Sequence, residues 1–183
     1  GAEEKKACAA VIDTLQLAQG EKVREFEEKF CQLTGRRYGV AVSSGFSALW
    51  LSLRVLSVGK GDEVIITSYT CAALLHAVDF VEAKPVVADI DRDDFNISAV
   101  AVKRKINKKT KAIIVPHMFG QAARMNQILD LKVPVIEDGT QALGAQCGGN
   151  PVGSFGVLSV FSFYATKMIT TGEGGMILTN SRQ

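Results

Sequence analysis

The sequence is poor in the residues that mark several common classes of protein. Its 183 residues include four cysteines, two histidines and one tryptophan. The cysteines form no CxxC pair, and two histidines are too few for a His-rich metal site. A chain of this size with 47% hydrophobic residues can build a core without disulfides, so we expect reduced thiols and a cytoplasmic location.

Excess charge of either sign is also lacking, since the formal net charge is +2. The chain therefore has no strong electrostatic field that would favour binding to nucleic acid or to a membrane surface. The basic run at residues 102–111 has no interleaved aromatic residues, which favours a solvated helix face and turn over a nucleic-acid patch. No apolar run is long enough to cross a membrane, and no signal-peptide pattern is found. We expect neither nucleic acid nor membrane as a partner.

Apolar runs and turn residues alternate along the chain. This pattern predicts helices at 3–19, 20–35, 47–58, 71–83 and 123–131, and strands at 38–43, 62–67, 84–90, 111–116, 133–138, 156–164 and 174–180. Strands that are apolar almost throughout and alternate with helices indicate an α/β fold. We expect a three-layer α/β/α sandwich with a mainly parallel sheet, forming one domain over residues 1–183.

Lys167 follows an apolar strand and precedes a loop with three glycines, in "FSFYATKMITTGEGG". Most lysines are surface residues, and this is the simpler interpretation. The alternative is a lysine that forms a Schiff base with a carbonyl, because partial burial at a strand end activates the amine as a nucleophile. Ligands of parallel sheets bind beyond the carboxyl ends of the strands, which is where this lysine is expected.

Asp138 ends another apolar strand, in "VPVIEDGTQALGA". A carboxylate there is costly unless it is paired or functional. It could cap a short helix, or it could keep the pyridine nitrogen of pyridoxal 5'-phosphate (PLP) protonated, as enzymes using this cofactor require. From the residues alone the two interpretations are about equal.

A candidate phosphate site lies in "VSSGFSALWL", where a strand passes through a small polar turn into a helix. The free N–H groups and dipole of a helix start attract a phosphate. Ser44, Gly45 and Ser47 have suitable sizes, and Ser162 could add a hydroxyl. A plain serine cap is the structural alternative. GxGxxG and GxSxG motifs are absent, and "VGKGDE" lacks the residues of a Walker loop.

Seven segments together resemble the DegT/DnrJ/EryC1/StrS family of fold-type-I PLP aminotransferases, many of which act on nucleotide-linked keto-sugars. They are "AVSSGFSALWLSL", "GDEVIITSYT", "KPVVADID", "KAIIVPHMFG", "VIEDGTQALGA", "GSFGVLSVFSFYATK" and "TTGEGGMILTN", in family order. The resemblance implies the large PLP-binding domain of this fold over residues 1–183, in part, with the small C-terminal domain absent. It also implies a homodimer.

The resemblance implies a role for each site residue. Lys167 would hold PLP as an internal aldimine and shuttle a proton, and Asp138 would pair with the pyridine nitrogen. Gln141 would lie near the phenolic oxygen, and Ser162 with the amides of Gly45 and Phe46 would hold the phosphate. The segment 67–71 would lie over the ring.

Two departures from the family pattern bear on the cofactor site. Phe46 stands where threonine is usual, so that Ser47 would have to supply the hydroxyl, and Cys71 stands where an aromatic residue often covers the ring. We expect a PLP-dependent aminotransferase that aminates a nucleotide-linked keto-sugar, with glutamate as the donor. The alternative is a truncated, non-catalytic PLP-fold module or interaction domain.

Overall fold

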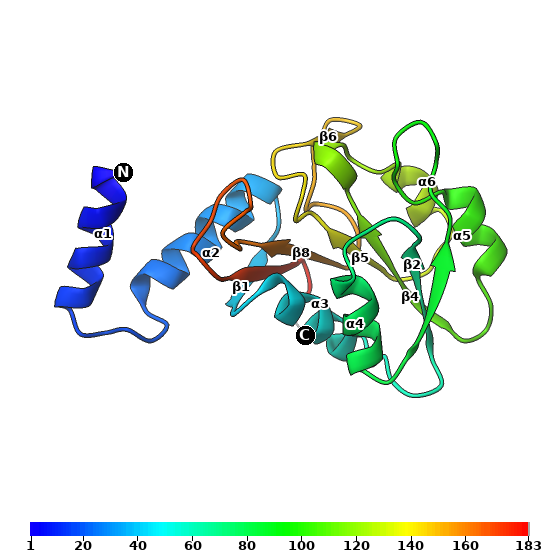
Figure 1. Cartoon of the computed structure of the whole chain (residues 1–183), viewed down its shortest axis with the longest axis horizontal. Coiled ribbons are helices and arrows are strands. Elements are labelled where there is room, and N and C mark those ends of the chain that lie inside the picture. Colours follow the sequence, from blue (N-terminus) through cyan, green and yellow to red (C-terminus); the bar gives the residue numbers. More distant parts are fainter. Residues whose placement is uncertain (183) are drawn as a thin grey trace.

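The computed structural model describes residues 1–182, and its centre is a seven-stranded sheet. The strand order is β1-β9-β8-β5-β4-β2-β3 (Figure 1). The strands are β1 (Tyr38–Val42), β2 (Glu63–Thr67), β3 (Lys84–Ala88), β4 (Thr110–Pro116), β5 (Val135–Asp138), β8 (Leu158–Ser162) and β9 (Gly175–Thr179). Strand β9 is antiparallel to β1 and β8, whereas the other pairs are parallel. The predicted mainly parallel sheet is confirmed.

Helices cover both faces of the sheet, which explains why its central strands are apolar almost throughout. Helices α3 (Gly45–Val55) and α4 (Ala73–Phe80) pack on one face. Helices α5 (Ala99–Lys105) and α6 (Met125–Leu129) pack on the other, at the end of the sheet with β2 and β3. Helix α2 (Glu21–Thr34) covers that second face near β8 and β9. The α/β/α layering is therefore confirmed (Figure 1).

The first predicted helix was too long. Helix α1 spans Ala2–Asp13 and not residues 3–19, because the Thr14 hydroxyl donates a hydrogen bond to the carbonyl of Val11 and Leu15 adopts a left-handed backbone with φ of 57°. The pattern also missed a two-stranded hairpin, β6 (Gln146–Cys147) with β7 (Asn150–Pro151), and the short 3₁₀ helix η1 (Met118–Gly120). Helix α5 was expected only as a helix face within the basic run at residues 102–111, and the other helices and strands differ from prediction by a few residues at their ends.

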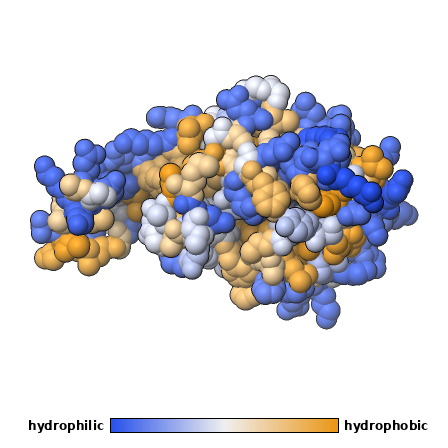
Figure 2. Space-filling view, turned by 45° about the horizontal axis from the view of Figure 1, so that its top comes forward, coloured by the Kyte–Doolittle hydropathy of each residue, from blue (hydrophilic) through white to orange (hydrophobic). Residues whose placement is uncertain are grey.

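Helix α1 stands away from the sheet, joined to α2 by a short connection (Figure 1). None of its residues is buried. Apolar surface gathers on this part of the molecule in Figure 2, where Ile12, Leu15 and Leu17 are exposed. No helix within residues 1–182 is long and apolar enough to span a bilayer.

The antiparallel strand β9 has a direct consequence for Lys167. Antiparallel neighbours can be joined without a crossover helix. Residues 163–174 accordingly run from β8 to β9 as a loop, and Lys167 lies in it. This loop emerges at the carboxyl end of β8, next to the carboxyl end of β5.

Candidate active site

A cavity of about 260 Å³ lies at the carboxyl ends of β5 and β8, beside the first turn of α3. The sheet brings together here residues that are far apart in the sequence. Eight predicted site residues line the cavity: Ser44, Gly45, Phe46, Cys71, Asp138, Gln141, Ser162 and Lys167. A larger groove of about 750 Å³ lies between α2 and β1, but it has neither the lysine nor the aspartate.

The first turn of α3 is fixed by a serine cap. The Ser44 hydroxyl accepts a hydrogen bond from the backbone N–H of Ser47 at 3.0 Å, which is the usual N-cap arrangement. The Ser47 hydroxyl contacts the hydroxyls of Ser43 and Ser44 at 2.9 and 3.0 Å. Ser47 therefore supports the turn but does not line the cavity. Its hydroxyl was predicted to bind the phosphate directly, but here it bonds to the two serines before it and does not face the cavity.

Glycine is required at position 45 by close packing. A Cβ atom there would lie 2.7 Å from the Cβ of Ser162, well inside the contact distance of two carbon atoms. The helix start and the end of β8 can approach each other only without that atom. This approach places the N–H groups of the first turn next to the Ser162 hydroxyl, a suitable pair of donors for an anion.

The side chain of Phe46 points toward α4. Its ring packs edge-on against Phe80 at a centroid distance of 5.9 Å. The bulky ring at this position is thus accommodated between α3 and α4, and Phe46 still lines the cavity. The hydroxyl that threonine would provide is lost, but the helix start is retained.

Asp138 is a buried carboxylate with few partners. It is 4% exposed, and its Oδ1 atom accepts a hydrogen bond from the backbone N–H of Thr140 at 3.0 Å. Burial raises the pKa of Asp138, while hydrogen bonds from Thr140 and the positive charge of Lys167 offset part of that increase. A cationic group of a ligand in the cavity would favour its ionised form.

Lys167 is half-buried in the β8–β9 loop, whose first turn is closed by a hydrogen bond from the Lys167 N–H to the carbonyl of Tyr164 at 2.9 Å. Within residues 1–182 its Nζ atom has no hydrogen-bond or ion-pair partner. Lys167 therefore lines the cavity, and no carboxylate of these residues holds its amine.

Several lining residues had no individual role in the prediction, although Thr70 belongs to the segment expected over the ring. They are Leu49, Thr70, Ala73, Leu74, Thr140, Tyr164 and Glu173. Glu173 lies in the same loop as Lys167, so its position after the lysine was the available signal. Gln141 and Cys71, which the family resemblance implied, enter from the turns after β5 and β2.

The cavity thus combines an amine, a buried carboxylate and a helix N-terminus in a mainly parallel α/β protein. An amine can bond to a carbonyl, the carboxylate can pair with a protonated heterocycle, and the helix start can bind a phosphate. These are the three groups needed to hold PLP, so the residues present fit this cofactor. A mainly parallel α/β fold with such a cavity is the arrangement expected of PLP-binding α/β enzymes.

Comparison with known proteins identifies the family. The family model "DegT/DnrJ/EryC1/StrS aminotransferase family" matches residues 1–183, and the chain belongs to this family. A curated relative, GDP-perosamine synthase of Escherichia coli O157:H7, is 37% identical over 185 residues, covering 98% of this chain and 51% of the relative.

Solved structures agree in both fold and sequence. An aminotransferase from Psychrobacter cryohalolentis superposes with a TM-score of 0.95 at 35% identity, covering 99% of this chain and 48% of that one. The PLP form of the putative sugar aminotransferase Spr1654 from Streptococcus pneumoniae superposes with a TM-score of 0.89 at 31% identity, covering 95% and 50%. The chain therefore spans about half the length of these relatives.

Proposed function

We propose that this chain carries the cofactor site of a PLP-dependent aminotransferase. The proposal rests on one observation above all: Lys167, Asp138 and the first turn of α3 line the same cavity. Membership in the aminotransferase family and the PLP form of a solved relative support the choice of cofactor.

Each residue of the cavity has a role in this proposal. Lys167 Nζ is the amine that would join the cofactor and later carry a proton to and from the substrate carbon. The carboxylate of Asp138 would accept a hydrogen bond from the ring nitrogen. Ser162 and the N–H groups at Gly45 and Phe46 would bind the phosphate. When bound, PLP supplies an electron sink for the reaction.

Two other residues would set the position of the ring. Cys71 would cover one face of it, as a smaller contact than an aromatic side chain gives. Gln141 would lie near the phenolic oxygen. Both line the cavity, which supports these assignments.

The proposed substrates are a nucleotide-linked keto-sugar and an amino-acid donor, with glutamate as the donor. The relative named GDP-perosamine synthase supports a sugar nucleotide as acceptor. Residues 1–183 would form part of the large domain of a cytoplasmic homodimer, although Gln183 lies outside the described residues.

The first experiment measures PLP binding. We expect the protein to turn yellow with PLP and to retain the cofactor covalently after borohydride reduction. Lys167→Ala is expected to abolish the covalent link, because no other lysine among residues 1–182 lines the cavity. An unchanged amount of reduced adduct in this variant would contradict the assignment.

A second experiment separates catalysis from binding alone, because the chain spans about half the length of its relatives. The protein is given an amino donor and a nucleotide-linked keto-sugar. Turnover supports the enzyme. PLP binding without turnover in this chain supports the alternative, a non-catalytic PLP-fold module.

A further inference from the structure

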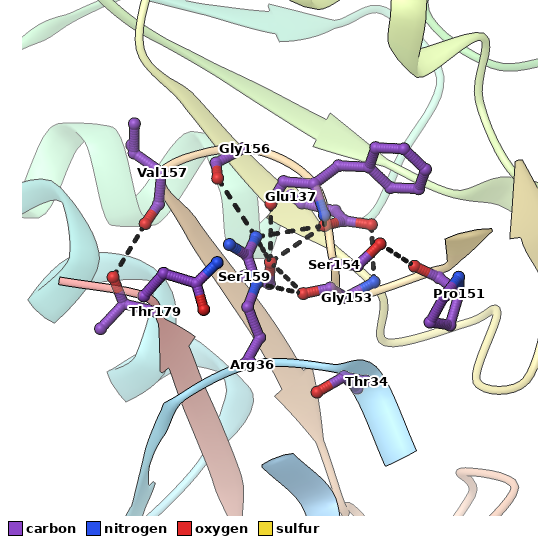
Figure 3. Close-up of polar contacts among 12 residues, drawn as sticks. Thr34, Arg36, Glu137, Pro151, Gly153, Ser154, Gly156, Val157, Ser159 and Thr179 are labelled. Carbon is purple, nitrogen blue, oxygen red and sulfur yellow. Dashed lines mark hydrogen bonds and ion pairs between the residues drawn. The ribbon is translucent and has the colours of Figure 1, made fainter. Parts of the chain in front are cut away.

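A cluster of buried polar side chains lies on the face of the sheet opposite the cavity. It consists of Arg36, Glu137 and Ser159, which we call the rear cluster. Arg36 is 7% exposed, and Glu137 and Ser159 are fully buried. Figure 3 shows the three side chains converging between β5, β8 and the turn at residues 151–156.

Glu137 accepts hydrogen bonds from several parts of the chain. The backbone N–H groups of Gly153 and Phe155 donate to its carboxylate at 2.7 and 2.8 Å. The Ser159 hydroxyl donates at 2.9 Å, and His117 Nε2 lies 2.9 Å from Oε1. Because His117 Nδ1 accepts the N–H of Ala123, the ring proton lies on Nε2 and is donated to Glu137.

Arg36 ties this carboxylate to the rest of the fold. Its guanidinium donates to the carbonyls of Gly153 and Gly156 at 2.6 and 3.2 Å, and it contacts the Ser159 hydroxyl at 2.8 Å. Its distance to Glu137 Oε2 is 3.9 Å. Burial lowers the pKa of Arg36, and the negative charge of Glu137 offsets part of that effect. The cluster thus joins the end of α2, β5, β8 and the 151–156 turn.

The rear cluster acts directly behind Asp138. Glu137 and Asp138 are consecutive in β5, so their side chains point to opposite faces of the sheet. Fixing the Glu137 carboxylate by four donors also fixes the peptide that carries Asp138. A second link supports this, because the backbone N–H of His117 donates to the carbonyl of Asp138 at 3.0 Å.

Stability alone does not account for such a cluster. Burying an arginine and a glutamate costs desolvation free energy, and apolar side chains of similar volume often stabilise a protein as well or better. What the polar cluster adds is a fixed geometry for the end of β5. A cofactor site requires that geometry, since its groups must be held to within about 0.5 Å of their working positions.

We propose that Arg36, acting through Glu137 and Ser159, is a positioning residue that holds the Asp138 carboxylate in place for its ligand. The inference rests on the proposed PLP site. Arg36 itself lies on the far face of the sheet and would not touch the cofactor.

The test compares PLP binding in matched variants of the whole chain. Arg36→Met is expected to weaken PLP affinity at least about tenfold, which is the loss seen in metal sites when a residue that supports a ligand is removed. It is also expected to reduce the visible circular dichroism of the bound cofactor. Arg36→Lys is expected to restore part of both signals. The control is Ile128→Ala, a fully buried change in α6 that lowers stability but alters no residue of β5 or of the rear cluster.

A double variant tests the route through Glu137. Because Arg36→Met leaves the Glu137 charge uncompensated, Arg36→Met with Glu137→Gln is expected to bind PLP better than the sum of the single losses predicts. If Arg36→Met does not fold, Ser159→Ala is measured in its place, with a weaker affinity expected.

The outcomes separate this inference from the proposed function. If the unaltered chain binds PLP and Arg36→Met binds it within twofold with the same dichroism, the positioning role is overturned and the proposed function stands. Equal losses of affinity and dichroism in Arg36→Met and Ile128→Ala would also overturn it, by showing a general effect of stability. An unaltered chain that does not bind PLP overturns both.

Discussion

The two consecutive carboxylates at the end of β5 occupy opposite environments on the two faces of the sheet. Glu137 is fully buried and accepts hydrogen bonds from Gly153, Phe155, Ser159 and His117. Asp138 is 4% exposed and accepts a backbone hydrogen bond from Thr140. The fold satisfies the first group completely and leaves the second with capacity for further bonds.

The difference distinguishes a structural acid from a functional one. A buried charge is tolerated when its partners are complete, as with Glu137. Burial raises the pKa of Asp138, so the surrounding chain does not fully stabilise its charged form. An acid with a perturbed pKa in a cavity is a candidate for a functional role. Asp138, which lines a cavity together with Lys167, fits that description.

The largest expected effect comes from Glu137→Gln. The amide would present N–H groups to donors that now meet a carboxylate oxygen, and it would leave Arg36 without its counter-charge. We expect a loss of about 3–5 kcal/mol in the free energy of unfolding, the range for breaking a buried ion pair. Urea denaturation of both chains measures it. A loss below about 1 kcal/mol would remove the distinction between the two acids.

Gly45→Ala tests whether ligand binding in the cavity depends on the close approach of α3 and β8. The added methyl group would lie 2.7 Å from Ser162 Cβ, so α3 or β8 must shift. We expect a loss of about 1–3 kcal/mol from overpacking, together with weaker binding of PLP and of inorganic phosphate. Calorimetry with phosphate measures the second effect. Ala48→Gly, at a buried site one turn further along α3, is the control for helix destabilisation and should retain more of the phosphate binding.

Asp138→Asn is the matched partner of Glu137→Gln, with the opposite result expected. We expect the free energy of unfolding at neutral pH to stay within about 1 kcal/mol or to rise, because a poorly solvated charge is removed. PLP affinity is expected to fall at least about tenfold, since the amide cannot form the ion pair with the ring nitrogen. Denaturation curves and absorbance titrations measure the two quantities on the same preparations.

The pH dependence of this pair follows from the direction of the shift. The pKa of Asp138 in the folded protein is raised above its ordinary value of 3.8. Its contribution to stability is therefore complete below that value and is lost as the pH rises through the folded pKa. The stability of Asp138→Asn relative to the parent chain should increase over this interval. A flat difference from acid to neutral pH would contradict the raised pKa.

Most of the fold and most of the cavity were predictable from the sequence. Apolar strands followed by polar residues predicted a parallel sheet, and the carboxyl ends of its strands placed Asp138, Ser162 and Lys167 at one edge. The rear cluster was not predicted. A single acid at a strand end gives a local signal, whereas the Arg36–Glu137 contact joins residues from distant parts of the chain and depends on the 151–156 turn.

Two smaller differences have local causes. The end of α1 depends on the Thr14 hydroxyl and the left-handed conformation of Leu15, neither of which changes the apolar pattern. The Ser47 hydroxyl could bind a phosphate, but it is already hydrogen-bonded to the hydroxyls of Ser43 and Ser44. Periodicity reports which face of a helix is apolar, but it does not report which of several hydroxyls remains available.

The smallest effect is expected at Glu25, a carboxylate that is well paired but exposed. Lys22 and Lys29 bond to it at 2.8 and 2.7 Å along α2, and they lower its pKa to about 2. Its contribution is present above the ordinary value of 4.5 and is lost as the pH falls through about 2. Glu25→Gln should therefore lower the thermal midpoint slightly at neutral pH and low salt, and not at all in high salt, because solvent screens such pairs. Thermal melts at two salt concentrations measure this. If the loss equalled that of Glu137→Gln, the number of partners, and not burial, would determine what a carboxylate contributes to this fold.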